Sequence, residues 1–180
     1  MSARILVAGI GNIFLSDDGF GSEAARRLAA IDLPDGVSVV DYGIRGMHLA
    51  YDLLDGYDAL VIIDAMPQKG GLPGDVAVME IGPEDLGTGD FDAHGMEPTA
   101  VLASLGNLGG TLPITYVVGC QPGDLDENIG LTPPVAAAVD VAVKAVLNLL
   151  DNQLADIPAR QPAQPAEHAR ATANTREGEH

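Results

Sequence analysis

The sequence of 180 residues has few basic side chains, a single cysteine and no long apolar run. Nine basic against 26 acidic side chains give a net charge of -17, which repels phosphate groups, so we expect neither nucleic acid nor a membrane surface as a partner. Cys120 alone cannot form an internal disulfide or a cysteine-based metal cluster, which suits a reducing cytoplasm. Glycine, proline or a carboxylate interrupts each apolar run, so we predict neither a membrane-spanning helix nor a signal peptide.

What the sequence does contain is enough apolar material for one folded domain. Hydrophobic residues make up 47% of the chain and charged residues 19%. Residues 1–150 carry 21 acidic and six basic side chains and form the predicted domain. Residues 151–180 are rich in Ala, Pro, Gln, Glu and Arg, with little beyond Leu154 and Ile157 to bury, so we predict a disordered tail in which His168 and His180 are solvated.

Apolar runs of strand length alternate with segments of helical period, which predicts an α/β sheet with helices on its faces. The predicted strands are Arg4–Ala8, Val37–Asp41, Ala59–Asp64, Asp75–Ile81 and Ile114–Gly119. All except the fourth contain β-branched runs without polar alternation, as expected of strands covered on both faces. The predicted helices are Gly21–Ala30, Met47–Leu54, Pro98–Leu105 and Pro134–Leu150. The connection from 64 to 75 is too short for a parallel crossover, so the fourth strand should be antiparallel.

A glycine-rich loop, Gly9–Gly21, lies where a dinucleotide-binding fingerprint would occur. Phe14 stands where that fingerprint needs Gly or Ala, and two adjacent carboxylates, Asp17 and Asp18, would repel a pyrophosphate. A structural interpretation is that Ser16 or Asp17 caps the following helix while Asp18 complements its dipole. That interpretation leaves one of the two aspartates without a role.

Two further residues, Asp64 and His94, could carry chemistry. Asp64 ends the most apolar predicted strand, at the edge where open α/β sheets place their ligands, although it could also be a turn-former. His94 precedes a helix; a loop histidine alone usually lies on the surface, but with two carboxylates from strand ends it would suit nickel or zinc. His48 lies within an amphipathic helical pattern and is interpreted as structural.

Other nucleophile signals are weak. Cys120 is expected to be a small buried hydrophobe, and the sequence has neither a Gly-x-Ser-x-Gly nor a His-Glu-x-x-His motif. Arg45 is an isolated cation in a glycine-flanked loop. It could form an ion pair with a nearby carboxylate, or it could bind a carboxylate of a peptide substrate.

Taken together, these motifs resemble those of the hydrogenase maturation protease family, in the family's order and from Ile5 to about Leu150. The matching motifs are Gly9-Ile10-Gly11-Asn12, Asp17-Asp18-Gly19-x-Gly21, Asp41-x-Gly43-x-x-Gly46, Ile63-Asp64-Ala65, His94, Gly119 with Pro122, and Ile129-Gly130-Leu131-Thr132-Pro133. The resemblance implies a three-layer α/β/α fold with a twisted, mostly parallel five-stranded sheet and one antiparallel strand.

The resemblance also implies an activity and a set of site residues. Such an endopeptidase removes a C-terminal extension from the large-subunit precursor of a nickel–iron hydrogenase after nickel insertion. The family's metal-contacting trio corresponds to Asp18, Asp64 and His94, which are the expected catalytic residues. The loop that positions the substrate corresponds to Asp41 and residues 43–46, including Gly43, Arg45 and Gly46. Ile44 departs from the family pattern, where a small hydroxyl residue is common.

A trio of ligands with open coordination positions could bind nickel that the substrate itself supplies, so that cleavage waits for the metal. Nickel could then polarise the scissile carbonyl, or it could only dock the substrate while a carboxylate activates water. Two other functions use the same residues: a non-catalytic nickel-delivery or scaffold protein, and a hydrolase that holds its own zinc.

Overall fold

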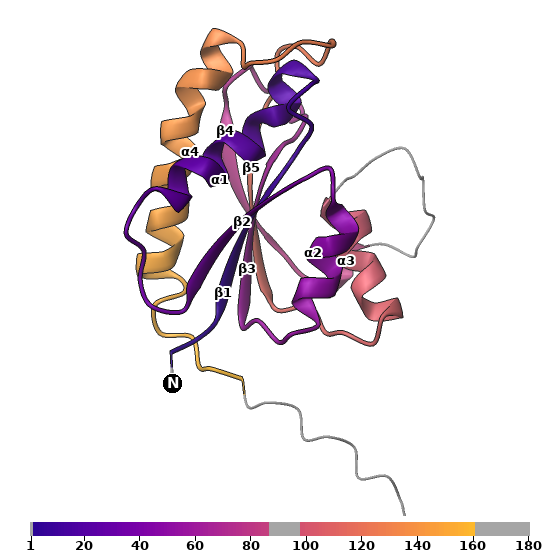
Figure 1. Ribbon diagram of the computed structural model, residues 1–180, viewed down its shortest axis with the longest axis vertical. Coiled ribbons are helices and arrows are strands. Elements are labelled where there is room, and N and C mark those ends of the chain that lie inside the picture. Colours follow the sequence, from indigo (N-terminus) through magenta and orange to yellow (C-terminus); the bar gives the residue numbers. More distant parts are fainter. Residues whose placement is uncertain (1, 87–97, 161–180) are drawn as a thin grey trace, which may run out of the picture.

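The computed structural model describes residues 2–86 and 98–160 and contains one five-stranded sheet (Figure 1). The strand order is β2-β1-β3-β5-β4. The strands are β1 (Ile5–Ile10), β2 (Val37–Gly43), β3 (Ala59–Ala65), β4 (Val76–Ile81) and β5 (Ile114–Cys120). β1, β2, β3 and β5 are parallel neighbours, whereas β4 runs antiparallel to β5. The predicted antiparallel fourth strand is therefore confirmed.

Helices cover both faces of the sheet, which confirms the predicted three-layer α/β/α fold. The helices are α1 (Phe20–Ala29), α2 (Gly46–Leu53), α3 (Pro98–Asn107) and α4 (Pro133–Asn152), with 3-10 turns η1 (Ser16–Gly19) and η2 (Pro83–Leu86). α1 and α4 lie on one face, and α2 and α3 lie side by side on the other (Figure 1). Each helix begins and ends within about two residues of its predicted bounds.

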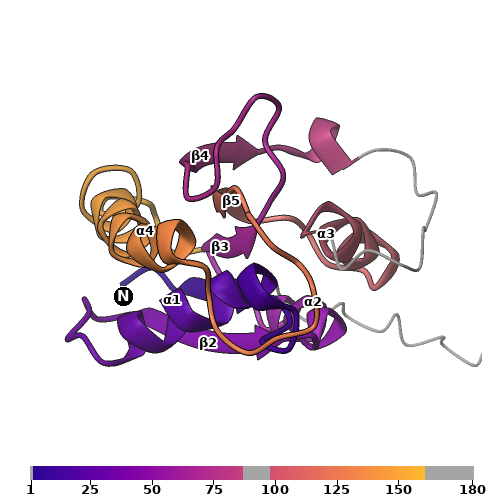
Figure 2. The same cartoon turned by 90° about the horizontal axis from the view of Figure 1, so that it is seen from above.

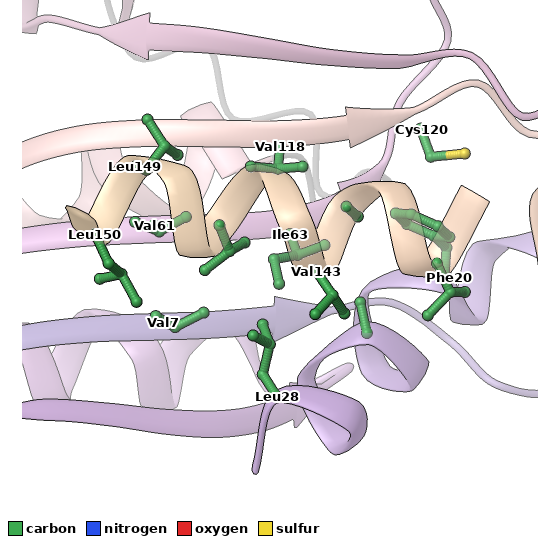
Figure 3. Packing of buried hydrophobic residues seen from close by; sticks show 14 of the residues in the cluster. Val7, Phe20, Leu28, Val61, Ile63, Val118, Cys120, Val143, Leu149 and Leu150 are labelled. Carbon is green, nitrogen blue, oxygen red and sulfur yellow. The ribbon is translucent and has the colours of Figure 1, made fainter. Parts of the chain in front are cut away.

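The two cores on either side of the sheet explain the apolar runs in the strands. Side chains of successive strand residues point to opposite faces, so a central strand covered on both sides is apolar throughout. In β1, Ile5 and Val7 pack with α1 and α4, and Leu6 packs with α2 and α3. Figure 3 shows the first core, where Val143 and Leu149 of α4 lie over the sheet.

β2 is covered on both faces, as predicted, but less fully than the central strands: Val39 packs against the core that holds α1 and α4, and Val40 packs against the core that holds α2 and α3. Val39 and Val40 are only partly buried. β2 is an edge strand with β1 as its single neighbour in the sheet, so its side chains have fewer apolar neighbours than those of β1 or β3. The β-branched pattern identified the strand but could not show its place in the sheet.

The longest helix, α4, is also long and apolar enough to cross a membrane when judged by length and composition alone. One of its faces is buried in the core with α1 and the sheet, through residues that include Val135, Val139 and Val146. Packing inside the protein therefore accounts for its apolar composition.

The predicted domain boundary at Asp151 was wrong for the first ten residues of the expected tail. α4 continues to Asn152, and Leu154 is 1% exposed within the core. Ile157 packs against the same core, and the backbone N–H of Arg160 donates to Asp58 Oδ1 at 2.5 Å. Composition alone could not show that the helix end carries these two apolar side chains to the core. Residues 161–180 lie outside the described residues.

We therefore predict that Leu154→Ala lowers the free energy of unfolding by about 2–5 kcal/mol, because it removes buried methyl groups and leaves a cavity. Urea unfolding followed by circular dichroism measures the effect. Val141→Ala on the exposed face of α4, where the side chain is 52% exposed, is the matched control and should change the value by less than about 0.5 kcal/mol. Equal effects of the two substitutions would show that residue 154 is not part of the core.

Candidate active site

A cavity of about 600 Å³ opens at the carboxyl edge of the sheet, and both Asp18 and Asp64 line it. Asp64 is the penultimate residue of β3 and pairs in register with Gly119 of β5. The buried strand thus carries its carboxylate to the edge where parallel sheets place ligands, and the side chain there is only 6% exposed. Asp18 and Asp64 therefore line one cavity, and their catalytic and metal-contacting roles stay a prediction.

Asp18 reaches the cavity from η1, the short turn between β1 and α1. Its Oδ2 atom accepts a hydrogen bond of 2.8 Å from the backbone N–H of Asn12. The side chain is half-buried, and the hydrogen bond restricts its orientation.

Close backbone contacts fix the position of η1 and α1 over the sheet. A Cβ atom added to Gly21 would lie 2.2 Å from the carbonyl oxygens of Ile10, at the end of β1, and Ile63, near the end of β3. One added to Gly9 would lie 2.4 Å from the carbonyl oxygen of Gly21. The two glycines therefore serve close packing of the helix start onto the strands, rather than phosphate binding.

Asp17 does not cap a helix, which corrects the structural interpretation of this loop; neither η1 nor α1 has a side-chain cap. Its carboxylate is fully buried and accepts four hydrogen bonds of 2.7–2.9 Å. The donors are the backbone N–H groups of Gly123, Asp124 and Thr132 and the hydroxyl of Thr132. Burial alone would raise the pKa of Asp17, but these hydrogen bonds lower it below its usual value.

These hydrogen bonds attach the loop at residues 121–132, which joins β5 to α4, to η1. Ser16 adds to the attachment: its hydroxyl donates to the carbonyl of Asp126 at 2.8 Å, and its N–H donates to the carbonyl of Asn128 at 2.9 Å. Ser16 has a φ of 49°, an uncommon conformation that these contacts hold. In Figure 2 the loop leaves β5 and passes beside η1 before it reaches α4. It thereby brings Leu125 to the cavity.

The segment from the end of β2 to the start of α2 contains the other predicted substrate contacts. Asp41 Oδ1 accepts hydrogen bonds from the Ser22 hydroxyl at 2.7 Å and from the Gly43 N–H at 3.0 Å. The carbonyl of Gly43, whose φ is +56°, accepts from the N–H of Gly11 at 3.0 Å. Asp41 and Gly43 thus join the end of β2 to α1 and to the loop after β1. Ile44, the next residue, lines the cavity.

Arg45 lies beside a second depression of about 330 Å³ that His48 and Tyr51 also line. Its guanidinium donates to the carbonyls of Tyr42 at 3.2 Å and Asp41 at 3.1 Å. Within residues 2–86 and 98–160, Arg45 forms no ion pair. The alternative that it pairs with a nearby carboxylate is therefore not supported in that part of the chain. Gly46 is buried at the start of α2. Substrate contacts by Asp41, Gly43, Arg45 and Gly46 stay a prediction.

His94 lies outside the described residues, so the complete trio of Asp18, Asp64 and His94 stays a prediction. Within the described part of the chain, no group of three His, Cys, Asp or Glu side chains is placed to hold a metal ion. A metal ion bound by Asp18 and Asp64 would therefore need a further ligand from outside the described residues or from a bound substrate.

The structure confirms that Cys120, at the end of β5, is a buried small hydrophobe. Burial, with a smaller contribution from the negative charge of Asp17, raises the pKa of its thiol to about 11. A thiol with this pKa is almost entirely protonated near neutral pH, so Cys120 is a poor nucleophile.

Sequence reasoning missed three features of the site: the buried hydrogen-bonding role of Asp17, and the cavity positions of Ile44 and Leu125. The pair Asp17-Asp18 gave a signal, because one of the two carboxylates lacked a role. No local pattern marks Leu125, since its place depends on how the loop folds back across η1.

Comparison with known proteins identifies the class to which this fold and carboxylate-lined cavity belong. A family model described as hydrogenase maturation protease matches residues 23–149. The hydrogenase 2 maturation protease of Escherichia coli is 36% identical over 150 residues, covering 82% of this chain and 90% of that protein. A putative hydrogenase maturation protease of Methanocaldococcus jannaschii is 32% identical, covering 79% of this chain and 94% of that protein. The chain belongs to the hydrogenase maturation protease family and is a peptidase.

Two solved structures agree with this assignment. The hydrogenase maturating endopeptidase HybD from E. coli aligns with a TM-score of 0.71 and 34% sequence identity, covering 83% of this chain and 93% of that one. The HybD maturation protease from Thermococcus kodakarensis aligns with a TM-score of 0.64 and 29% identity, covering 81% and 98%. The five-stranded mixed sheet with its helices is thus the fold of this family.

We predict that Asp17→Asn lowers the free energy of unfolding at neutral pH by about 2–4 kcal/mol, because an amide cannot accept all four hydrogen bonds and leaves buried donors unpaired. The folded-state pKa lies below the ordinary 3.8, so the stabilisation by the carboxylate is present above that value and is lost as the pH falls through the folded pKa. The difference in free energy of unfolding between the wild type and Asp17→Asn should therefore become smaller as the pH is lowered from neutral to about 3, as measured by urea unfolding. Asp32→Asn, on an exposed loop, is the control and should be close to neutral. A pH-independent difference would contradict this account.

We also predict that Cys120 in the native protein reacts with an aromatic disulfide reagent at least about 100-fold more slowly than a free thiol, because it is both buried and protonated. Absorbance of the released thiolate at mildly alkaline pH measures the rate. The same protein in guanidinium chloride is the control and should react fully. Fast labelling of the native protein would show that the thiol is accessible.

Proposed function

We propose that this protein is an endopeptidase that removes the C-terminal extension of a nickel–iron hydrogenase large-subunit precursor after nickel has been inserted. The observation that carries the proposal is the meeting of Asp18 and Asp64 at one cavity, in a chain of the hydrogenase maturation protease family. The reduced state expected of Cys120 is compatible with action in the cytoplasm, where such a precursor would be assembled.

Nickel enters this proposal as part of the substrate. Thiolates of the precursor hold the ion, and Asp18, Asp64 and His94 fill coordination positions that the precursor leaves open. Carboxylate and imidazole are both ligands that a divalent nickel ion accepts. A precursor without nickel then lacks a contact that docks it, so cleavage follows metal insertion.

Hydrolysis needs a water molecule, a base and a route for the leaving amine. In the proposed step an aspartate at the cavity accepts a proton from water as the oxygen adds to the scissile carbonyl carbon. The C–N bond then breaks, and the amine nitrogen receives the proton from the same carboxyl group. Asp64, which is 6% exposed at the end of β3, is the more buried of the two carboxylates that could do this.

The direct test is incubation of the purified protein with purified nickel-loaded precursor, followed by intact-mass measurement of the precursor. Removal of a C-terminal peptide is expected, together with little cleavage of the same precursor prepared without nickel. Nickel transfer without a change in precursor mass would instead favour a delivery or scaffold protein. Stoichiometric zinc in the purified protein would favour a hydrolase that holds its own metal.

We predict that Asp18→Asn, Asp64→Asn and His94→Ala each reduce processing by at least about 100-fold, because each removes a ligand without removing core volume. Intact-mass kinetics on the nickel-loaded precursor measure the loss, and circular dichroism checks the fold.

Two matched controls separate this effect from a general loss of charge. Asp85→Asn lies in η2 and His48→Ala lies on α2, and neither residue lines the cavity. Both controls should process the precursor at nearly the wild-type rate. Near-normal cleavage by His94→Ala would remove His94 from the proposed trio.

A further inference from the structure

Two large aliphatic side chains on the cavity wall are exposed to solvent. Ile44 is 62% exposed and Leu125 is 49% exposed, and both line the cavity that holds Asp18 and Asp64. Single exposed apolar residues are common on protein surfaces, but these two share one concave site with two carboxylates. Contact with an apolar group of a bound substrate would remove their surface from water.

The two side chains come from separate parts of the fold. Ile44 lies in the loop after β2, and Leu125 lies in the loop after β5, with β1 and β3 between those two strands in the sheet. A peptide that reaches Asp18 and Asp64 therefore lies between these two loops, at the carboxyl edge of the sheet.

Both loops are held in place before any substrate binds. The four hydrogen bonds of the Asp17 carboxylate and the two of Ser16 fix the loop that carries Leu125. The hydrogen bonds of Asp41 and of the Gly43 carbonyl fix the loop that carries Ile44. A preformed apolar wall loses little conformational entropy when a ligand packs against it.

The charge of the cavity narrows the class of side chain that it accepts. Among its described lining residues, Asp18 and Asp64 carry charge and none is basic. The guanidinium of Arg45, next to Ile44 in sequence, is directed to the carbonyls of Tyr42 and Asp41. An acidic side chain would therefore meet like charges here, and a basic one would compete with nickel for Asp18 and Asp64. Asn12 and Thr99 are the uncharged polar side chains among the described lining residues, and Asn12 Oδ1 already accepts a hydrogen bond from the N–H of Phe14. The exposed aliphatic surface of Ile44 and Leu125 is best matched by an aliphatic side chain.

We propose that Ile44 and Leu125 are specificity-determining residues that receive an aliphatic side chain of the precursor directly beside the scissile bond. This inference rests on the proposed function and adds the chemical class of the residue at the cleavage site. Apolar pockets discriminate by about 10-fold or more for each methylene group they bind, so two such walls give a measurable preference.

The test uses a precursor that the wild-type protein shortens, with the cleavage site located by product mass. The residue on each side of that site is replaced in turn by Leu or by Asn, two side chains of similar shape and opposite polarity. The value of kcat/KM for each precursor is measured with the wild type, Ile44→Ser, Leu125→Ser and the control Ile129→Ser. Ile129 is 70% exposed on the same loop as Leu125 and is not among the residues that line the cavity.

For the wild type we expect kcat/KM to favour Leu over Asn by at least about 10-fold at one of the two positions. Ile44→Ser and Leu125→Ser should each lower that ratio by at least about threefold, mainly through KM, while Ile129→Ser keeps it. Melting temperatures check that all variants fold.

Two outcomes would overturn the inference while the proposed function stands: a wild-type protein that cleaves Leu and Asn precursors equally well, or an unchanged ratio in both cavity variants. A wild-type protein that shortens no precursor would overturn the proposed function, and with it this inference.

Discussion

The buried carboxylate of Asp17 is the interaction on which the site depends. A charged group without solvent is stable only when hydrogen bonds replace its water, and four donors from the loop after β5 do so here. The bonds join segments more than 100 residues apart in sequence. Asp18 is the next residue in sequence, and Leu125 lies on the loop that Asp17 binds. One buried carboxylate therefore helps to position both of these cavity residues.

The sheet supplies the other half of the site. β3 is buried on both faces, so its direction and register are strongly fixed, and Asp64 at its end cannot shift without moving the core. Gly9 and Gly21 let α1 approach the same strands closely. A rigid central strand and a tightly packed helix start therefore hold the two carboxylates at one edge, as positioning of a scissile bond requires.

The acidic character of the chain is compatible with the proposed recognition of a metal-bearing precursor, because a negatively charged protein attracts cations and repels anions. Two carboxylates in one cavity favour a cation at the reacting centre, and the apolar side chains of Ile44 and Leu125 favour a neutral peptide segment beside it. Under the proposed function, charge selects the metal and apolar surface selects the neighbouring side chain. The two criteria act on different parts of one substrate.

The sequence by itself determined the elements and the class of protein. Hydrophobic period and strand length depend on local chemistry, so strands and helices were predicted to within about two residues, and the short connection after Asp64 fixed the antiparallel strand. Only the tertiary structure decided that β2 is an edge strand, that Leu154 belongs to the core and that Asp17 joins two loops instead of capping a helix. Those facts depend on contacts between distant residues, and no local pattern of side chains encodes which distant groups meet.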